Sequence, residues 1–164
     1  MKVIKSNTVT PTTLTATDVP ENDASEWVTS TNYHVGDQAM VTTTANGAAT
    51  ATHKIYVSVH SQSGNDPTID DGTNWTEVSS TNRFKMFNNV VQEQTSNSNI
   101  IDVTVTSGVV TTSLAAINVS CASITVTVTD PTEGQVYNQT FPMTSYSGIT
   151  NWYDYFFTAI NRKN

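Results

Sequence analysis

The sequence predicts an all-β protein, a β-sandwich or jelly-roll with a small β-rich aromatic module inserted near the N-terminus. First, only 13% of the 164 residues are charged, about half the usual share. Thr, which favours strands, and Ser and Asn, which favour turns, take their place. Second, apolar residues alternate with polar ones in several short segments, which is the period of a half-buried strand. Short strands between polar turns are typical of sandwiches and jelly-rolls.

Residues 1–23 are expected to form an extended N-terminal arm. Their apolar residues are spaced through a Thr-rich background that Pro11 and Pro20 interrupt. Such an arm can add a strand to a sheet edge, either in its own subunit or in a neighbouring one. Pro20-Glu21-Asn22-Asp23 has the composition of a turn and ends the arm.

Residues 24–80 are expected to form the small module. It contains Trp27, Tyr33, Tyr56 and Trp75. Two strands are predicted, Gln38–Val41 and Lys54–Val59, and the second alternates apolar and polar positions. Residues 42–52 between them read as a flexible loop of Thr, Ala, Asn and Gly. Residues 61–74, rich in Gly, Asn, Asp and Pro, predict a second loop.

Residues 81–164 are expected to form the larger domain and most of its core. Alternation predicts the strands that begin at Ile101 and Ile124, and a mixed apolar run predicts the one at Leu114. Pro and Gly predict a hairpin turn, and only residues 84–90 allow a short helix. The predicted elements are strands at Ile101–Val105, Leu114–Val119 and Ile124–Val128, a turn at Asp130–Gly134, a return strand at Val136–Phe141 and a last, aromatic strand at Trp152–Ile160.

Charge and cysteine content exclude several classes of function. Seven basic and 14 acidic residues give a formal charge of −7, and such a surface repels nucleic acid, whose binding needs Lys and Arg. No segment has the apolar length of a membrane span or of a signal peptide. The single cysteine, Cys121, can form no internal disulfide, and its strand-like surroundings predict a buried, inert thiol.

Four aromatic residues of the module have two interpretations. Trp27, Tyr33, Tyr56 and Trp75 flank a Gly36-Asp37 turn. They could stack on the C–H faces of sugar rings, since aromatic faces suit that contact. They could instead be the core of the module, which has few other large apolar side chains. The sequence leaves both alternatives open.

The segment Thr81-Asn82-Arg83-Phe84-Lys85-Met86-Phe87 predicts a junction between the module and the larger domain. Asn82 can turn the chain through its side-chain hydrogen bonds. Arg83 presents a planar fork that suits a carboxylate. Phe84, Met86 and Phe87 are apolar, so we expect them to plug the junction while Arg83 pairs internally.

Together these motifs resemble two known families. The spacing of Trp27, Tyr33, Gly36-Asp37, Tyr56, Pro67 and Trp75 resembles chitin- and cellulose-binding modules of the family 5/12 type. Such a unit followed by Thr-Asn-Arg-Phe-x-Met-Phe resembles bacteriophage tail proteins of the tail tip, baseplate and fibre attachment. That resemblance implies a galactose-binding-like β-sandwich after the module, with the aromatic segment near residue 152 as part of it.

The function expected from this resemblance is structural. The chain would be a component of a phage virion tail, made in the host cytoplasm, that assembles with other tail proteins and with its own copies around the tail axis. The alternative is a carbohydrate-binding module that contacts host-surface glycans. The expected anchors of the sandwich are Phe84, Phe87, Trp152, Tyr155 and Phe157.

No enzyme, cofactor or metal site is expected. The sequence lacks a nucleophile elbow, a zinc-protease helix and a phosphate loop. Its three histidines do not form a zinc pattern. Asp66, Asp70 and Asp71 share one loop without the spacing of a calcium-binding EF-hand, so we expect them to form turns.

Overall fold

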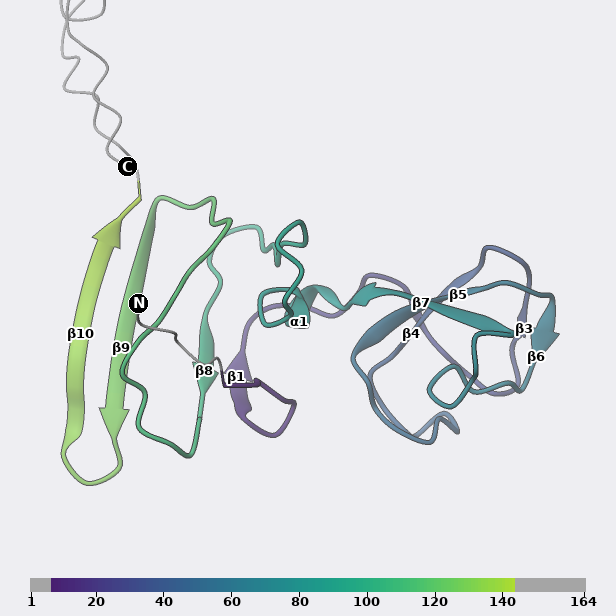
Figure 1. Ribbon diagram of the computed structural model, residues 1–164, viewed down its shortest axis with the longest axis horizontal. Helices are drawn as coiled ribbons and strands as arrows, with labels where there is room; N and C mark the ends of the chain where they lie inside the picture. The colour runs from purple at the N-terminus through teal and green to yellow at the C-terminus, as the bar shows by residue number, and fades with distance from the viewer. Residues whose placement is uncertain (1–6, 144–164) are drawn as a thin grey trace, which may run out of the picture. The chain divides into compact units, whose positions relative to one another are not determined.

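A computed structural model describes residues 7–143 (Figure 1). Strands dominate this part of the chain and its helix is a single turn, which confirms the predicted all-β class. No helix among the described residues is long and apolar enough to cross a membrane. The elements are β1 Leu14–Thr17, β2 Ser25–Glu26, β3 Asn32–Tyr33, β4 Gln38–Val41, β5 Lys54–Ser58, β6 Gln62–Ser63, β7 Trp75–Ser80, α1 Asn82–Lys85, β8 Val103–Val105, β9 Ser123–Asp130 and β10 Gly134–Pro142.

The strands form small, open sheets. The largest has four strands in the order β2-β4-β5-β7, and the pairs β1–β8, β3–β6 and β9–β10 form two-stranded sheets. None of these described sheets is closed. The chain divides into two compact units, one that ends at Asn118 and one that begins at Val119. The predicted boundaries after residues 23 and 80 stay predictions.

The four-stranded sheet organises the aromatic module, and it contains the two strands that the sequence predicts there. β4 and β5 pair antiparallel from Gln38↔Val57 to Val41↔Lys54. β5 and β7 also pair antiparallel, with Ser58 opposite Trp75 and a bulge between Ile55 and Tyr56. Three consecutive residues of β4, Ala39 to Val41, are buried, so this strand passes through the core rather than along its surface.

The Gly36-Asp37 turn sets the start of β4. Gly36 has a φ of 90°, in the left-handed region that glycine adopts without steric cost. Its N–H donates to the carbonyl of Ser58 at 2.8 Å, and the carboxylate of Asp37 accepts the N–H of His34 at 2.7 Å. These bonds fix β4 against β5 and explain the Gly-Asp pair of the sequence.

The arm pairs with a strand of its own chain. β1 lies antiparallel to β8, with Leu14 opposite Val105 and Thr17 opposite Val103. The carboxylate of Asp18 accepts the N–H of Asp102 at 2.8 Å and so extends the pairing. Of the two alternatives for the arm, the structure therefore shows the intramolecular one for residues 14–17.

The second unit is built on the β9–β10 hairpin, whose strands and turn the sequence predicts. The turn ends at Gly134, which has a φ of 79°. The Oδ1 atom of Asp130 accepts the N–H groups of Thr132 and Glu133 at 2.7 and 3.0 Å. These two bonds lower the pKa of Asp130, because they favour its ionised form.

Two predictions in this region are wrong. Leu114–Val119 forms no strand, because its apolar residues do not alternate with polar ones, and Leu114 and Ile117 are exposed. Cys121 is exposed rather than buried, since it lies in the bend before β9. The predicted strand Trp152–Ile160 lies outside the described residues.

Candidate functional site

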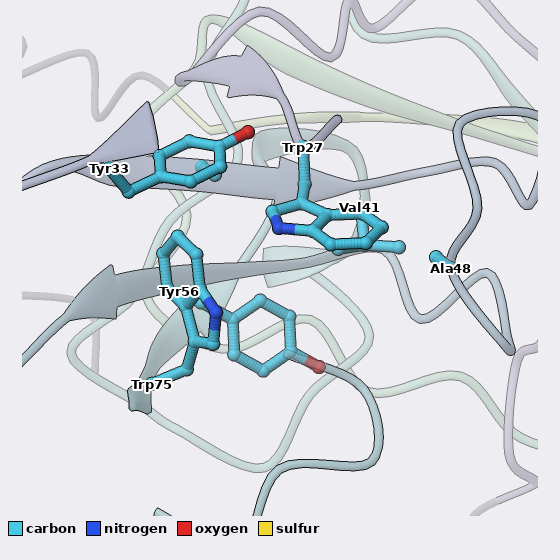
Figure 2. Packing of buried hydrophobic residues seen from close by; sticks show 7 residues of the cluster. Trp27, Tyr33, Val41, Ala48, Tyr56 and Trp75 are labelled. Atoms are coloured by element: carbon cyan, nitrogen blue, oxygen red, sulfur yellow. The ribbon is translucent and has the colours of Figure 1, made fainter. Parts of the chain in front are cut away.

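The four aromatic residues proposed as a ligand platform lie together in the core of the module. Trp27 is 1% exposed, Tyr33 7%, Tyr56 6% and Trp75 2%. Figure 2 shows their rings gathered between the strands, with Val41 and Ala48 beside Trp27. The rings of Tyr33 and Trp75 meet edge to face, with centroids 4.9 Å apart, an arrangement that aromatic pairs favour.

Three of the four rings use their polar atoms inside the module, whereas the buried indole nitrogen of Trp27 has no partner among the described residues. The hydroxyl oxygen of Tyr33 accepts the N–H of Val28 at 2.8 Å. The indole N–H of Trp75 donates to the carbonyl of Asn65 at 2.8 Å, which ties β7 to the loop before it. Of the two interpretations, burial and these bonds favour the core. Sugar stacking on these four rings would require the core to open.

A depression lies beside the start of β4, at the end of the strand away from the loop after Val41. It has a volume of about 280 Å³ and is open to solvent. Apolar atoms form somewhat more of its surface than polar atoms do, but its lining includes residues with hydroxyl, amide and carboxylate groups, which can hydrogen-bond a small polar ligand. The polar lining residues are Ser25, Glu26, Thr31, Asn32, Asp37 and Gln38.

The junction segment begins where β7 ends, and the side chain of Asn82 joins it to a segment 14 positions further along the chain. Its side-chain amide donates to the carbonyl of Ser96 and accepts the N–H of the same residue, both at 2.8 Å. The backbone N–H of Asn82 donates to Asp23 at 2.9 Å. The side chain of Thr81 does not cap α1, so a carboxylate from the end of the arm takes over that role.

Glu21 is the centre of the junction. Its side chain is 7% exposed. Its Oε1 atom accepts the hydroxyl of Thr81 at 2.6 Å and lies 2.8 Å from Nδ1 of His53. Its Oε2 atom lies 2.8 Å from a guanidinium nitrogen of Arg83, whose Nε donates to the carbonyl of Val19 at 2.9 Å. Arg83 thus pairs internally, as the sequence predicts.

These partners determine the ionisation of Glu21. Burial would raise the pKa of its carboxyl group, because a charge is poorly solvated there. Hydrogen bonds from His53 and Thr81, together with the charges of His53 and Arg83, outweigh burial and lower the pKa. An ionised carboxylate only accepts hydrogen bonds, so Nδ1 of His53 carries a proton toward it.

The apolar residues of the junction are only half-buried. Phe84, Met86 and Phe87 all keep part of their surface exposed. The ring of Phe84 packs on the ring of His53, with centroids 4.5 Å apart, and its centroid lies 6.4 Å from that of Phe87. Phe84 thus has one ring neighbour in the aromatic module and one in the junction itself. The other expected anchors, Trp152, Tyr155 and Phe157, lie outside the described residues.

The aspartates of the 61–74 loop hold turns. Asp70 accepts the N–H groups of Gly72, Asn74 and Trp75 at 2.9 to 3.0 Å. Burial acts to raise the pKa of Asp70, but bonds from Asn74 and from the backbone outweigh it, and the pKa is lowered. Asp66 accepts the N–H of Ala49 at 2.6 Å. Within residues 7–143, no three His, Cys, Asp or Glu side chains come close enough to hold a metal ion.

Sequence reasoning found Arg83 and Asn82 but missed their acidic partners. Glu21 and Asp23 appear in the sequence only as parts of a polar turn. Arg83 lies 62 positions after Glu21, and Asn82 lies 59 positions after Asp23, so no local spacing could connect them. Comparison of the chain with protein-family models, curated proteins and solved structures finds no match.

Proposed function

We propose that this protein is a structural component of a bacteriophage tail, at the tail tip, the baseplate or a fibre attachment, and that it acts by assembling with other proteins. The observation that carries the proposal is the distribution of exposed apolar side chains. Among residues 7–143, 17 large apolar side chains are exposed, and 14 of them lie between Val90 and Met143. Surfaces of this kind mark protein–protein contacts.

Charged residues are fewer where the exposed apolar side chains are more numerous. Between Pro20 and Lys85 the chain has 11 Asp, Glu, Lys and Arg residues, whereas between Val90 and Met143 it has four. Depletion of charge is a mark of the centre of an interface. The hydroxyl groups of the many threonines cost less to bury than charges do. The part of the chain that exposes apolar residues is therefore also the part whose burial in a contact costs the least desolvation free energy.

The junction motif supports the tail assignment. Asn82 and Arg83 make the bonds that a chain-turning residue and an internal ion pair require. In the proposal, residues 81–164 form a galactose-binding-like sandwich. Several copies would then surround the tail axis, since closed rings are the usual form of such assemblies.

Analysis of virions tests the tail assignment. Purified particles of the phage that encodes the chain should contain it in a copy number that matches the symmetry of the tail, measured by quantitative mass spectrometry. Disruption of its gene should stop tail completion, and supply of the full chain in trans should restore it. Particles that lack the chain and infect normally would refute the proposal.

Glycan binding is the second proposal. The depression beside the start of β4 supports it, and the buried aromatic rings do not. The full chain should then be retained on immobilised chitin, cellulose or host-surface glycan. Gln38→Ala and Asn32→Ala should reduce retention, whereas the control Thr125→Ala, on the β9–β10 hairpin, should not. Equal retention of all variants, or none by the wild type, would contradict a sugar site there.

A further inference from the structure

We propose that a depression between β1 and the junction segment binds a small organic acid, whose carboxylate Arg83 receives. The depression has a volume of about 330 Å³, and polar atoms form more of its surface than apolar atoms do. Residues Leu14–Thr17 of β1 line it together with His53, Arg83 and Phe84, all within the first compact unit. It shares no lining residue with the depression beside the start of β4. It therefore adds a binding site to the functions proposed above.

Arg83 supplies the donors for such a ligand. A guanidinium group has five N–H donors. Its Nε donates to the carbonyl of Val19 at 2.9 Å, and its Nη1 lies 2.8 Å from Oε2 of Glu21. No acceptor among the described residues binds either N–H of Nη2, and the side chain of Arg83 is 31% exposed. Guanidinium N–H groups form strong, charge-assisted hydrogen bonds with carboxylates, so Arg83 can bind a second carboxylate besides that of Glu21.

His53 brings a second polar atom to the depression. Its Nδ1 donates to Glu21 at 2.8 Å, whereas its Nε2 has no hydrogen-bond partner among residues 7–143. The backbone of His53 has a φ of 53°, which is uncommon for a residue other than glycine. Two hydrogen bonds hold it there, from its N–H to Val41 at 2.8 Å and from the N–H of Thr81 to its carbonyl at 2.9 Å. Residues held in such strained conformations are concentrated at binding and active sites.

The charges around the depression favour a carboxylate over a phosphate. Glu21 already gives Arg83 one negative partner, and Lys85, the next cation along the chain, is paired with Asp23 at 3.2 Å. A phosphate dianion would add two negative charges close to Glu21, with one guanidinium to compensate them. A carboxylate adds only one, and its planar shape matches the guanidinium fork. A monovalent acid therefore meets the least repulsion.

The rest of the lining determines what else the acid carries. The half-buried ring of Phe84 packs on that of His53, with centroids 4.5 Å apart, and Leu14 lines the same depression. These side chains provide an apolar surface for a compact carbon skeleton. The hydroxyl oxygen of Thr17 accepts the N–H of Val19 at 3.1 Å, and its hydrogen has no acceptor among the described residues. It can therefore bind one further polar group of the ligand.

Titration of the ¹⁵N-labelled full chain, followed by nuclear magnetic resonance, tests the site. Sodium benzoate and sodium glucuronate are the probes, with benzyl alcohol and glucose as neutral analogues and sodium chloride to match the ionic strength. Benzoate should shift the Nε–H signal of Arg83 and the amide signal of Ala16 saturably, with a dissociation constant on the order of 1 mM. Stronger binding of glucuronate would identify an acidic sugar as the source of the carboxylate, and stronger binding of benzoate an apolar acid.

Two substitutions that leave the contacts of Glu21 in place make the test specific. Ala16→Glu adds a negative charge at an exposed lining residue and should raise the dissociation constant at least 10-fold. Thr76→Glu is the matched control, at an exposed position of β7. It lies five strand residues before Thr81, about 16 Å away, which exceeds the screening length of about 8 Å at physiological salt.

The control should bind benzoate like the wild type. Equal weakening by the two substitutions would overturn the proposal. So would shifts of the same size with the neutral analogues, or no saturable shift with either acid. None of these results bears on the presence of the chain in virions or on retention by the variants at Asn32 and Gln38, so the failure of each proposal is distinguishable.

Discussion

The hydroxyl of Thr81 donates a hydrogen bond of 2.6 Å to the carboxylate of Glu21, although 60 positions separate the two residues. The bond joins the segment that enters the aromatic module to the segment that leaves it. Thr81 is fully buried, and its N–H also donates to the carbonyl of His53 at 2.9 Å. The two ends of the module are thereby held together, as an inserted module requires.

We predict that Glu21→Gln destabilises the fold by about 1–3 kcal/mol, the cost of leaving buried donors without a charged acceptor. Arg83 and His53 would lose their anion, while the shape of the side chain would be kept. The free energy of unfolding, measured by urea denaturation, checks this. Glu77→Gln is the control, because Glu77 forms an exposed pair with Lys54 at 2.6 Å, and such pairs contribute at most about 1 kcal/mol. Equal effects of the two substitutions would contradict a central role for Glu21.

The same carboxylate predicts a pH dependence. The pKa of Glu21 is lowered from its ordinary value of 4.5, so the unfolded chain binds this proton at a higher pH than the folded chain does. The stabilisation is therefore complete well above pH 4.5 and is lost as the pH falls below it. The difference in unfolding free energy between wild type and Glu21→Gln should shrink from neutral pH to pH 3. A difference that stays constant would refute the shift.

The sequence predicted elements whose signal is local. β5 and β9 show alternation, and Asp130 to Gly134 has the Pro and Gly of a tight turn. These features depend on neighbours within a few residues, so one sequence suffices. The strand predicted at Leu114–Val119 failed because it rested on a mixed apolar run, which lacks the period of two of a half-buried strand.

Only the residues on one side of the junction, those that follow β7, could be predicted from the sequence. Asn82 and Arg83 stand in a recognisable motif, whereas Glu21 and Asp23 lie in an ordinary polar turn. Which carboxylate Arg83 binds depends on how the two ends of the module meet, and that is a tertiary property. The same limit applies to the four aromatic rings, because the sequence gives their spacing but not which way they face.

We predict that Trp75→Ala unfolds or severely weakens the aromatic module, at a cost of about 3–5 kcal/mol, since it removes a large buried ring. Loss of the contact with Tyr33 and of the bond to Asn65 adds to the effect. Thermal unfolding followed by near-ultraviolet circular dichroism measures it. Val35→Ala is the control, because Val35 is 67% exposed, and its effect should stay within about 0.5 kcal/mol. A stable Trp75→Ala variant would place the ring outside the core.

We predict that Gly134→Ala weakens the β9–β10 hairpin by about 1–2 kcal/mol, because an L-residue is strained in the left-handed conformation. A Cβ atom at this position would meet no other atom within 4 Å, so the φ of 79° is the source of the cost. Gly134→Asn should cost less, since Asn adopts this conformation more readily. Amide hydrogen exchange of Val126 and Gln139 reports opening of the hairpin. If the two variants exchange at the same rate as the wild type, the turn does not limit the stability of the hairpin.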